Sequence, residues 1–447
     1  MRFFGAVGGW VLASTLMICS PGWGAPLFGE PRAYPVGTSP VGIAVGEFSG
    51  TPGLDLATVE EGNTVTILTN DGEGAFTRGG QITIAARYVP TGIASGRFNN
   101  DLIDDFALSA EDNENLDFYG AAVLYESTAA FRYNATGVTV GLSPACISFA
   151  DITGDGIPDL LICASAADAS GVLSVIPGQA DGTFGAASAI SLGAVVPYRL
   201  VAADIDHDAA SRPDLLVVDM VGNAVWIFYG KDPGALPGPA FEPPVMLASV
   251  TSPTAAVVAA FGQDALPDIA VTSAASGSGQ VLIFRQQAPR TFAQPVAYPV
   301  GAAPVALAAA DFDNTGTVDL LSANNQSSDV TLLLGYADGT FEPAETVGVG
   351  AGPVAIAVGD FNGDNRPDFA TANQDDETFG LNSQSVSVVL NILTLFDPNC
   401  DGKVDAADVT TVTHRIFDGT SGCLDRPVTA ADITLTVLSM GTAGVQE

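Results

Sequence analysis

Short apolar runs separated by polar turns fill most of the chain, and the runs come in groups of four. One group consists of residues 304–312, 318–324, 329–336 and 342–350. Runs of this length, bounded by Asp, Asn and Gly, are typical of β-strands rather than helices. The intervening segments, such as Asp-Asn-Thr-Gly and Ala-Asp-Gly-Thr-Phe, contain the residues that favour chain reversal. The pattern therefore predicts an all-β fold built from four-stranded units.

Each unit begins with a repeated phrase. Its clearest copy is PVAIAVGDFNGDNRPDFATAN at residues 353–373. Six weaker copies begin near Pro40, Pro90, Pro144, Pro197, Pro253 and Pro304. A repeat of roughly fifty residues is in the range of propeller blades and solenoid repeats. Seven units, with small alanine-rich first strands that suit a crowded centre, predict a seven-bladed β-propeller.

The two ends of the repeated region complement each other. The seventh unit has three strands, at 353–361, 366–372 and 385–393, and lacks a fourth. Residues 28–37, FGEPRAYPVG, resemble the fourth strand FAQPVAYPVG at 292–301. We expect residues 28–37 to complete blade seven and close the ring, because closure removes exposed sheet edges.

The first 25 residues have the composition of a secretory signal. Arg2 precedes an apolar run from Phe3 to Ile18, and small residues follow as far as Ala25. Cys19 leaves a lipid anchor open as an alternative. We expect a signal peptide at 1–25 and a protein that is secreted or at the cell surface, of bacterial type. No later apolar stretch is long enough to predict a membrane span.

The net charge of the chain argues against some classes of binding partner. The formal net charge is −35 and the isoelectric point is near 4.1. Such an acidic chain is not expected to bind nucleic acid or anionic membrane surfaces. Much of the acid occupies regular loop positions, so bound cations could neutralise part of it.

Four cysteines remain after the signal segment, and they allow three pairings. Cys146 and Cys163 flank one hairpin loop symmetrically, which places them opposite each other on paired antiparallel strands. Cys400 and Cys423 lie in two corresponding loops near the C-terminus. An exported protein can form both disulfides. Two buried free thiols at Cys146 and Cys163 are the alternative.

Oxygen-bearing side chains alternate in the loops between first and second strands. Alternating oxygens on a tight glycine-containing loop can surround a hard cation that needs six to eight oxygen ligands, which favours Ca²⁺. The corresponding loops at 47–55, 97–105 and 260–268 are poor copies. The alternative for any loop is an Asx-rich turn without metal. The candidate ligands, some through backbone carbonyls, are Asp151, Thr153, Asp155, Ile157 and Asp159; Asp204, Asp206, Asp208 and Asp214; Asp311, Asp313, Thr315, Thr317 and Asp319; and Asp360, Asn362, Asp364, Arg366 and Asp368.

The repeats at 28–393 resemble those of the FG-GAP and VCBS type, as in the seven-bladed propeller of integrin α subunits. The resemblance implies a propeller at residues 26–394 with Ca²⁺ in the loops. It is weak as a guide to the ligand, because this architecture serves adhesion, sugar binding and some lyases.

Residues 395–447 resemble a dockerin module. An EF-hand-like loop with Gly402 at its turn would take Ca²⁺ through Asp397, Asn399, Asp401, the Lys403 backbone and Asp408. The second copy departs from the pattern, with Arg426 in place of the turn glycine. A Cys400–Cys423 disulfide could replace the second ion there. The resemblance implies docking to a cohesin-like scaffold, and the alternative is a small helical cap without a partner.

Groups suited to catalysis are scarce. The chain has two histidines, His207 and His414, and neither has a visible nucleophile partner. We therefore expect no catalytic residues and no organic cofactor. The preferred function is non-catalytic binding of an extracellular polysaccharide or protein by a monomer. The long loops at 109–120 and 373–385 would lie together on the face opposite the calcium loops.

Two other functions stay open. A polysaccharide lyase or hydrolase would need cationic groups beside an acidic sugar. The arginines available for that role are Arg87, Arg97, Arg199 and Arg290, and their gathering in one pocket with Tyr88 or Tyr198 would favour the enzyme. A structural surface protein is the third possibility.

Overall fold

The structure is a computed structural model of the chain. It describes residues 27–392 except 99–101, 113–118, 130–131, 166–169, 208–212, 232–239, 276–277, 343–344 and 376–383. Residues 27–392 form one compact unit. The predicted signal segment and the predicted dockerin-like module lie outside the described residues.

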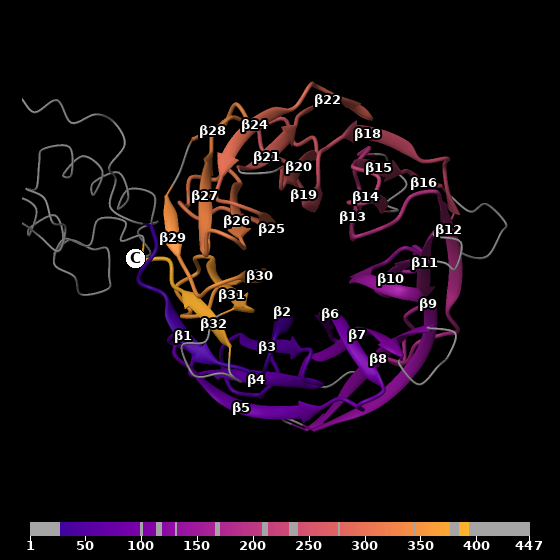
Figure 1. Cartoon of the computed structure of the whole chain (residues 1–447), viewed down its shortest axis with the longest axis vertical. Helices are drawn as coiled ribbons and strands as arrows, with labels where there is room; N and C mark the ends of the chain where they lie inside the picture. The colour runs from indigo at the N-terminus through magenta and orange to yellow at the C-terminus, as the bar shows by residue number, and fades with distance from the viewer. Residues whose placement is uncertain are drawn as a thin grey trace, which may run out of the picture. The chain divides into compact units, whose positions relative to one another are not determined.

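Seven antiparallel blades stand around a common axis as a propeller (Figure 1), and blades two and three share one continuous seven-stranded sheet. Blade one consists of β2 (Pro40–Gly46), β3 (Asp55–Glu60), β4 (Thr64–Asn70) and β5 (Phe76–Thr83). Blade two consists of β6 (Tyr88–Gly96), β7 (Asp105–Asp112), β8 (Tyr119–Ala129) and the first half of β9 (Arg132–Ala150). The second half of β9 opens blade three, which continues with β10 (Asp159–Ser165), β11 (Gly171–Ile176) and β12 (Ser188–Gly193).

The remaining blades follow the same order from the centre outward. Blade four consists of β13 (Arg199–Ala203), β14 (Asp214–Asp219), β15 (Ala224–Phe228) and β18 (Val245–Ser249). Blade five consists of β19 (Pro253–Ala259), β20 (Asp268–Ser273), β21 (Gly279–Phe284) and β24 (Val296–Val300). Blade six consists of β25 (Pro304–Ala310), β26 (Asp319–Asn324) and β27 (Asp329–Gly335), with both β28 (Phe341–Glu342) and β29 (Thr346–Gly348) against β27. Two short hairpins extend blades four and five: β16 (Gly230–Lys231) with β17 (Ala240–Phe241), and β22 (Gln286–Ala288) with β23 (Thr291–Phe292).

Blade seven confirms the predicted closure of the ring. Its strands β30 (Pro353–Gly359), β31 (Asp368–Asn373) and β32 (Ser385–Val389) are joined by β1 (Arg32–Pro35) from the start of the propeller. Phe28 adds a bridge to Asn391. Its buried ring packs edge-on against Phe312 at 5.6 Å and Phe369 at 4.9 Å between ring centroids. The ring is therefore closed by sheet pairing and by aromatic packing.

The hydrophobic core lies between neighbouring blades. The second strands are buried along almost their whole length, so their sequences read as near-continuous apolar runs, such as DLLVVD in β14. Valines and isoleucines of β3 and β4 pack against Phe106 and Leu108 of β7. All strands are antiparallel to their neighbours, and none of the described residues forms a helix. The described part of the chain accordingly contains no helix long and apolar enough to cross a membrane.

A disulfide joins the first two strands of blade three, as the sequence predicts. Cys146 of β9 stands opposite Cys163 of β10, with Cα atoms 5.1 Å apart, and the two sulfurs are bonded. Both side chains are buried among the apolar residues between blades three and four. The bond crosslinks residues 17 apart in the sequence.

Removing this disulfide should destabilise the propeller. The double variant Cys146→Ala, Cys163→Ala should lose about 3 kcal/mol of unfolding free energy, because a crosslink of this loop length restricts the unfolded chain by about that amount. Urea denaturation of the variant and of the oxidised wild type measures the difference. A reducing agent should lower the stability of the wild type and leave the variant unchanged. Equal stability of oxidised wild type and variant would contradict a stabilising crosslink.

Candidate metal centres

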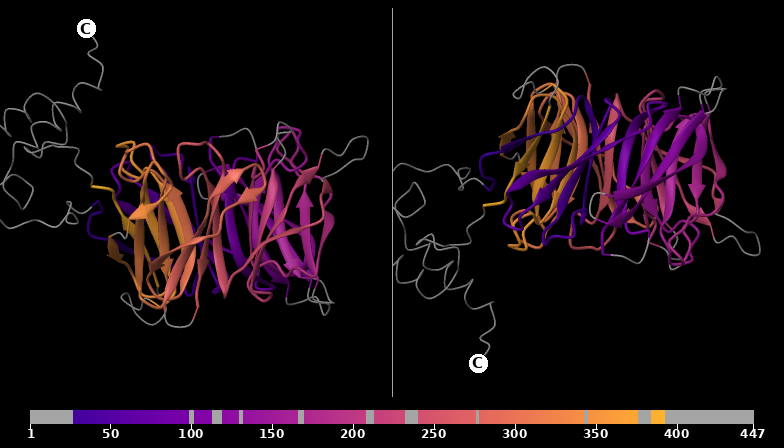
Figure 2. Two further views of the ribbon diagram at one scale, coloured as in Figure 1. Left: turned by 90° about the horizontal axis from the view of Figure 1, so that it is seen from above. Right: turned by 90° about the horizontal axis from the view of Figure 1, so that it is seen from below.

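The loops between first and second strands lie at one face of the ring, together with the turns between third and fourth strands (Figure 2). The turns between second and third strands and the blade-to-blade connections lie at the other face. This follows from the antiparallel order of the strands. We call the first the loop face and the second the opposite face.

A buried aspartate begins the second strand of every blade. We call these residues the clip aspartates. Each carboxylate accepts a hydrogen bond from the backbone N–H of the residue seven to nine positions earlier, with donor–acceptor distances of 2.6–3.1 Å. In blade one and in blades three to seven, an N–H at or just after the end of the third strand also donates to the same carboxylate. The clip aspartates are Asp55, Asp105, Asp159, Asp214, Asp268, Asp319 and Asp368.

These contacts show that the last aspartate of the loop has a structural role in every blade, including those whose loops are poor metal sites. The sequence pattern assigns Asp159, Asp214, Asp319 and Asp368 to metal binding alone. Their carboxylates also hold the loop and the end of the third strand together. Each oxygen has two lone pairs, so an ion can share the carboxylate with the backbone donors.

Burial raises the pKa of several clip aspartates. The pKa rises to about 7 for Asp319 and Asp368 and to about 6 for Asp214. Loss of hydration is the main cause, and nearby loop carboxylates such as Asp313 beside Asp319 add to it. The backbone N–H donors partly offset the rise. A cation at these positions would favour the ionised forms.

Blade six brings its loop carboxylates together. Oxygens of Asp311, Asp313 and Asp319 all lie within 4.8 Å of one another. The Asp311 carboxylate also accepts the N–H groups of Thr315 and Gly316, which fixes the turn. Gly316 has φ +83°, a conformation that favours glycine. Three converging carboxylates on a tight loop fit a hard divalent cation such as Ca²⁺.

Blade four has the second such group. Oxygens of Asp204, Asp206 and Asp214 also lie within 4.8 Å of one another. Among the described residues, blades four and six are the two places where three or more such side chains meet in this way. In blade four, however, the Asp206 carboxylate also accepts hydrogen bonds from Arg290.

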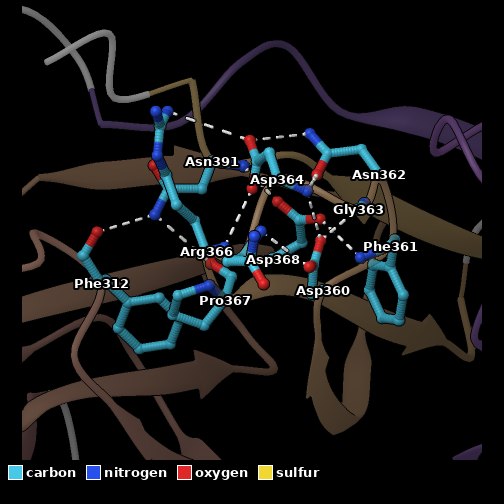
Figure 3. A network of polar contacts seen from close by, with 11 residues as sticks. Phe312, Asp360, Phe361, Asn362, Gly363, Asp364, Arg366, Pro367, Asp368 and Asn391 are labelled. Atoms are coloured by element: carbon cyan, nitrogen blue, oxygen red, sulfur yellow. Dashed lines mark hydrogen bonds and ion pairs between the residues drawn. The ribbon is translucent and has the colours of Figure 1, made fainter. Parts of the chain in front are cut away.

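Blade seven holds its loop by internal hydrogen bonds (Figure 3). The Asp360 carboxylate accepts N–H bonds from Gly363, Asp364 and Asn365. Asn362 donates from its side chain to Asp364, at 3.0 Å. The N–H of Arg366 also donates to Asp364, and this turns the Arg366 backbone towards the loop. The predicted ligands therefore share one small loop above Asp368.

Blade three has the same arrangement. The Asp151 carboxylate accepts N–H bonds from Gly154, Asp155 and Gly156, and Asp155 accepts one from Ile157. Thr153 donates its backbone N–H to the clip aspartate Asp159. Several predicted ligands lie outside the described residues: Asp208, Asp397, Asn399, Asp401, Lys403 and Asp408, together with Cys400 and Cys423.

The predictions from the sequence do not include a set of side-chain hydrogen bonds between neighbouring blades, which we call the amide latches. The side-chain amides of Asn70, Gln286 and Asn391 each donate to a backbone carbonyl in the loop of the preceding blade, at 2.7 Å. The acceptors are Phe361, Ile205 and Phe312, in the same order. An Asn or Gln just after the third strand is the sequence feature that could have revealed these contacts.

The four arginines considered for an enzyme have separate partners. Arg87 pairs with Asp112 and stacks on Tyr88, at 4.7 Å from the ring centroid. Arg97 pairs with Asp104, and Arg199 stacks on Tyr198 at 4.6 Å and donates to the Ala145 carbonyl. Arg290 pairs with Asp206 and Glu242. The contacts therefore give no sign of the common cationic pocket that would favour a lyase.

Comparison with known proteins identifies the repeats. The FG-GAP-like repeat family matches residues 261–322 and 311–371, which cover blade six and parts of blades five and seven. No curated protein sequence matches the chain. One solved structure with a similar outline is a candidate 6-phosphogluconolactonase from Bacteroides fragilis. It is 12% identical, with a TM-score of 0.49, and the match covers 73% of this chain and 97% of that one. The chain is a seven-bladed β-propeller that contains FG-GAP-like repeats.

Proposed function

We propose that this chain is a secreted, calcium-stabilised β-propeller that binds an extracellular polysaccharide without catalysis. The proposal of calcium binding rests on three carboxylates that converge in a half-buried loop, those of Asp311, Asp313 and Asp319. An ion bound by the native state alone stabilises it by mass action. The dockerin-like segment would tether the propeller to a scaffold, and capture by immobilised cohesin domains would test that role.

A groove between blades one and two is the best candidate for the ligand site. It has a volume of about 730 Å³, within the range of small-molecule sites. Asn63 comes from the turn between β3 and β4, Ile84–Ala86 connect β5 to β6, and Tyr125 and Tyr133 come from the outer strands β8 and β9 of blade two. Its Tyr88 pairs with Asp112 at the end of β7; of the long loop predicted at 109–120, residues 109–112 belong to β7 and residues 119–120 to β8.

Three tyrosine side chains line the groove and provide both apolar rings and polar hydroxyls. Tyr88, Tyr125 and Tyr133 line it together with Asn63 and Thr83. Tyr125 stacks on Phe106 at 4.7 Å, and Tyr133 meets the same ring edge-on at 4.9 Å. Burial raises the pKa of Tyr125 to about 12, so its hydroxyl stays neutral. Tyrosine combines an apolar ring with a polar tip, which suits contact with sugar rings and hydroxyls.

The charge of the groove favours a neutral polysaccharide. None of its lining residues carries a charged side chain, although the chain as a whole has a formal net charge of −35. An anionic polymer would be repelled by the chain, and Arg87, which stacks on Tyr88 beside the groove, is already paired with Asp112. A neutral glycan meets no such penalty.

Polysaccharide pull-down of the full chain tests this proposal. Tyr88→Ala should weaken retention on a neutral polysaccharide about fivefold, since an aromatic contact contributes about 1 kcal/mol. Tyr198→Ala is the matched control, because this tyrosine also has a stacked arginine but lies outside the groove. Retention on acidic polymers alone, or no retention, would contradict the neutral-glycan site and favour a protein partner. Release of reducing ends over time would overturn the non-catalytic role.

A further inference from the structure

Blade five lacks a metal loop but contains a guanidinium in its place. The first and third loop positions, which are Asp311 and Asp313 in blade six, are Ala260 and Gly262 in blade five. Arg285, just after β21, directs its Nε to Asp268 at 2.9 Å and its Nη2 to Asp264 at 3.2 Å. One side chain thus meets both carboxylates that remain in the loop.

Two glycines make room for Arg285. A Cβ at Gly262 would lie 2.5 Å from Nη2, and a Cβ at Gly339 in blade six would lie 1.3 Å from Nη1. The Nη1 group donates to the Asp338 carbonyl, which ties blade five to blade six. The guanidinium therefore occupies the space above Gly262, at the position where blade six has the carboxylate of Asp313.

A second arginine from the same segment reaches the loop of blade four. Arg290, in the turn of the β22–β23 hairpin, places its Nε 2.8 Å from the Asp206 carboxylate. Its guanidinium lies over the ring of Tyr229 at 4.1 Å and pairs with Glu242 at 3.1 Å. Asp206 is buried, with 4% of its surface exposed, and Asp204 and Asp214 lie next to it.

The backbone conformation at Arg290 indicates that its side-chain contacts stabilise the fold. The equivalent turns in blades three and six read Ala-Asp-Gly-Thr-Phe, and their glycines Gly182 and Gly339 have φ +86° and +75°. Blade five reads Ala-Pro-Arg-Thr-Phe, and Arg290 adopts φ +60°. A residue with a Cβ is strained in this conformation, where glycine is not. Contacts of the guanidinium with Asp206, Tyr229 and Glu242 offset that strain.

We propose that Arg285 and Arg290 are built-in cations that replace calcium in the loops of blades five and four. This inference rests on the proposed calcium role for the remaining loops. Calcium then binds in blades three, six and seven, and the neighbouring blades four and five are held without metal. Arginine suits the role because its guanidinium stays charged and can contact two carboxylates at once.

Calcium stoichiometry of the full chain tests the proposal. Arg290→Gly restores the glycine of the equivalent turns and frees the Asp206 carboxylate, which lies next to those of Asp204 and Asp214. It should bind one more Ca²⁺ ion than the wild type in equilibrium dialysis. Arg78→Ala is the control for lost positive charge, because Arg78 lies exposed on β5, away from these loops. The control should bind the same number of ions as the wild type.

Thermal unfolding separates the two arginines. Arg285→Met should lower the melting temperature equally in calcium and in EDTA, because Asp264 and Asp268 alone are too few ligands to hold an ion. Full recovery of Arg285→Met by calcium would overturn the proposal, as would an unchanged ion count for Arg290→Gly. If the wild type binds no calcium but Arg290→Gly binds one ion, the proposed calcium role fails and the replacement by arginine stands.

Discussion

Replacing Asp268 by alanine should lower the free energy of unfolding by about 2–6 kcal/mol, because two buried backbone donors lose their acceptor at a cost of about 1–3 kcal/mol each. Asp268 is fully buried and accepts the N–H groups of Phe261 at 3.1 Å and Gln286 at 2.6 Å. It also pairs with Arg285. The alanine variant would leave the two buried N–H donors without their acceptor, whereas Arg285 would keep its contacts with Asp264 and the Asp338 carbonyl. Urea denaturation followed by circular dichroism measures the loss.

Blade five suits this test because its loop has Ala260 and Gly262 at the two positions where the blade-six loop has aspartates. The loss should therefore be equal in calcium and in EDTA. Asp264→Ala is the matched control: it removes an exposed carboxylate from the same arginine and should cost about 0–1 kcal/mol. A similar cost for both variants, or rescue of Asp268→Ala by calcium, would contradict a structural role for the clip aspartates.

The sequence predicts the fold because similar residue types recur at equivalent positions in each repeat. Each blade carries a first strand with small residues and a loop that ends in aspartate, and blades three and six share the turn Ala-Asp-Gly-Thr-Phe. The complementary ends at 28–37 and 385–393 predict closure for the same reason. One feature of the fold escapes this reasoning. The expected start near Pro144 lies inside β9, a single 19-residue strand that runs from blade two into blade three.

The local irregularities at the start of blade three recur in other blades: Ser39, Ser252 and Ala303, each just before a first-strand proline, also have positive φ. The pairing of β9 with β10 shifts register between Cys163 and Ser165, and Ser143 has φ +45°. A bulge tolerates a residue without an N–H, which is compatible with Pro144 inside β9, but the same changes accompany prolines that begin separate strands, such as Pro40 and Pro304. The sequence pattern alone would place a break at that proline.

The candidate site is predictable only in part. Loop spacing identifies the carboxylates, because ligands of one ion lie close together in the sequence. Arg290 and Asp206 are 84 residues apart, and Gln286 and Ile205 are 81 residues apart. Such contacts depend on how neighbouring blades pack, and their residue types follow no spacing rule. The arginine contacts and the amide latches therefore become visible only in the folded ring.

The calcium-free protein should lose stability as the pH rises from about 4 to about 7. The pKa values of Asp319 and Asp368 are raised to about 7 in the folded state, mainly by burial, whereas an unfolded aspartate has a pKa of about 3.9. The folded state therefore binds protons more tightly than the unfolded state. This stabilisation is fully present below about pH 4 and disappears as the pH passes about 7. Each unit of pKa difference corresponds to about 1.4 kcal/mol.

Calcium should reverse this trend, because the ion binds the ionised carboxylates and displaces their protons. The difference in melting temperature between calcium-loaded and EDTA-treated protein should therefore grow as the pH rises from 5 to 7.5. Asp319→Asn should reduce both the pH slope in EDTA and the gain from calcium. Asp71→Asn should change neither, because backbone N–H groups lower the pKa of this exposed carboxyl and it is already ionised at pH 5. Calcium and EDTA curves that stay parallel across this range would mean that no ion binds at these carboxylates.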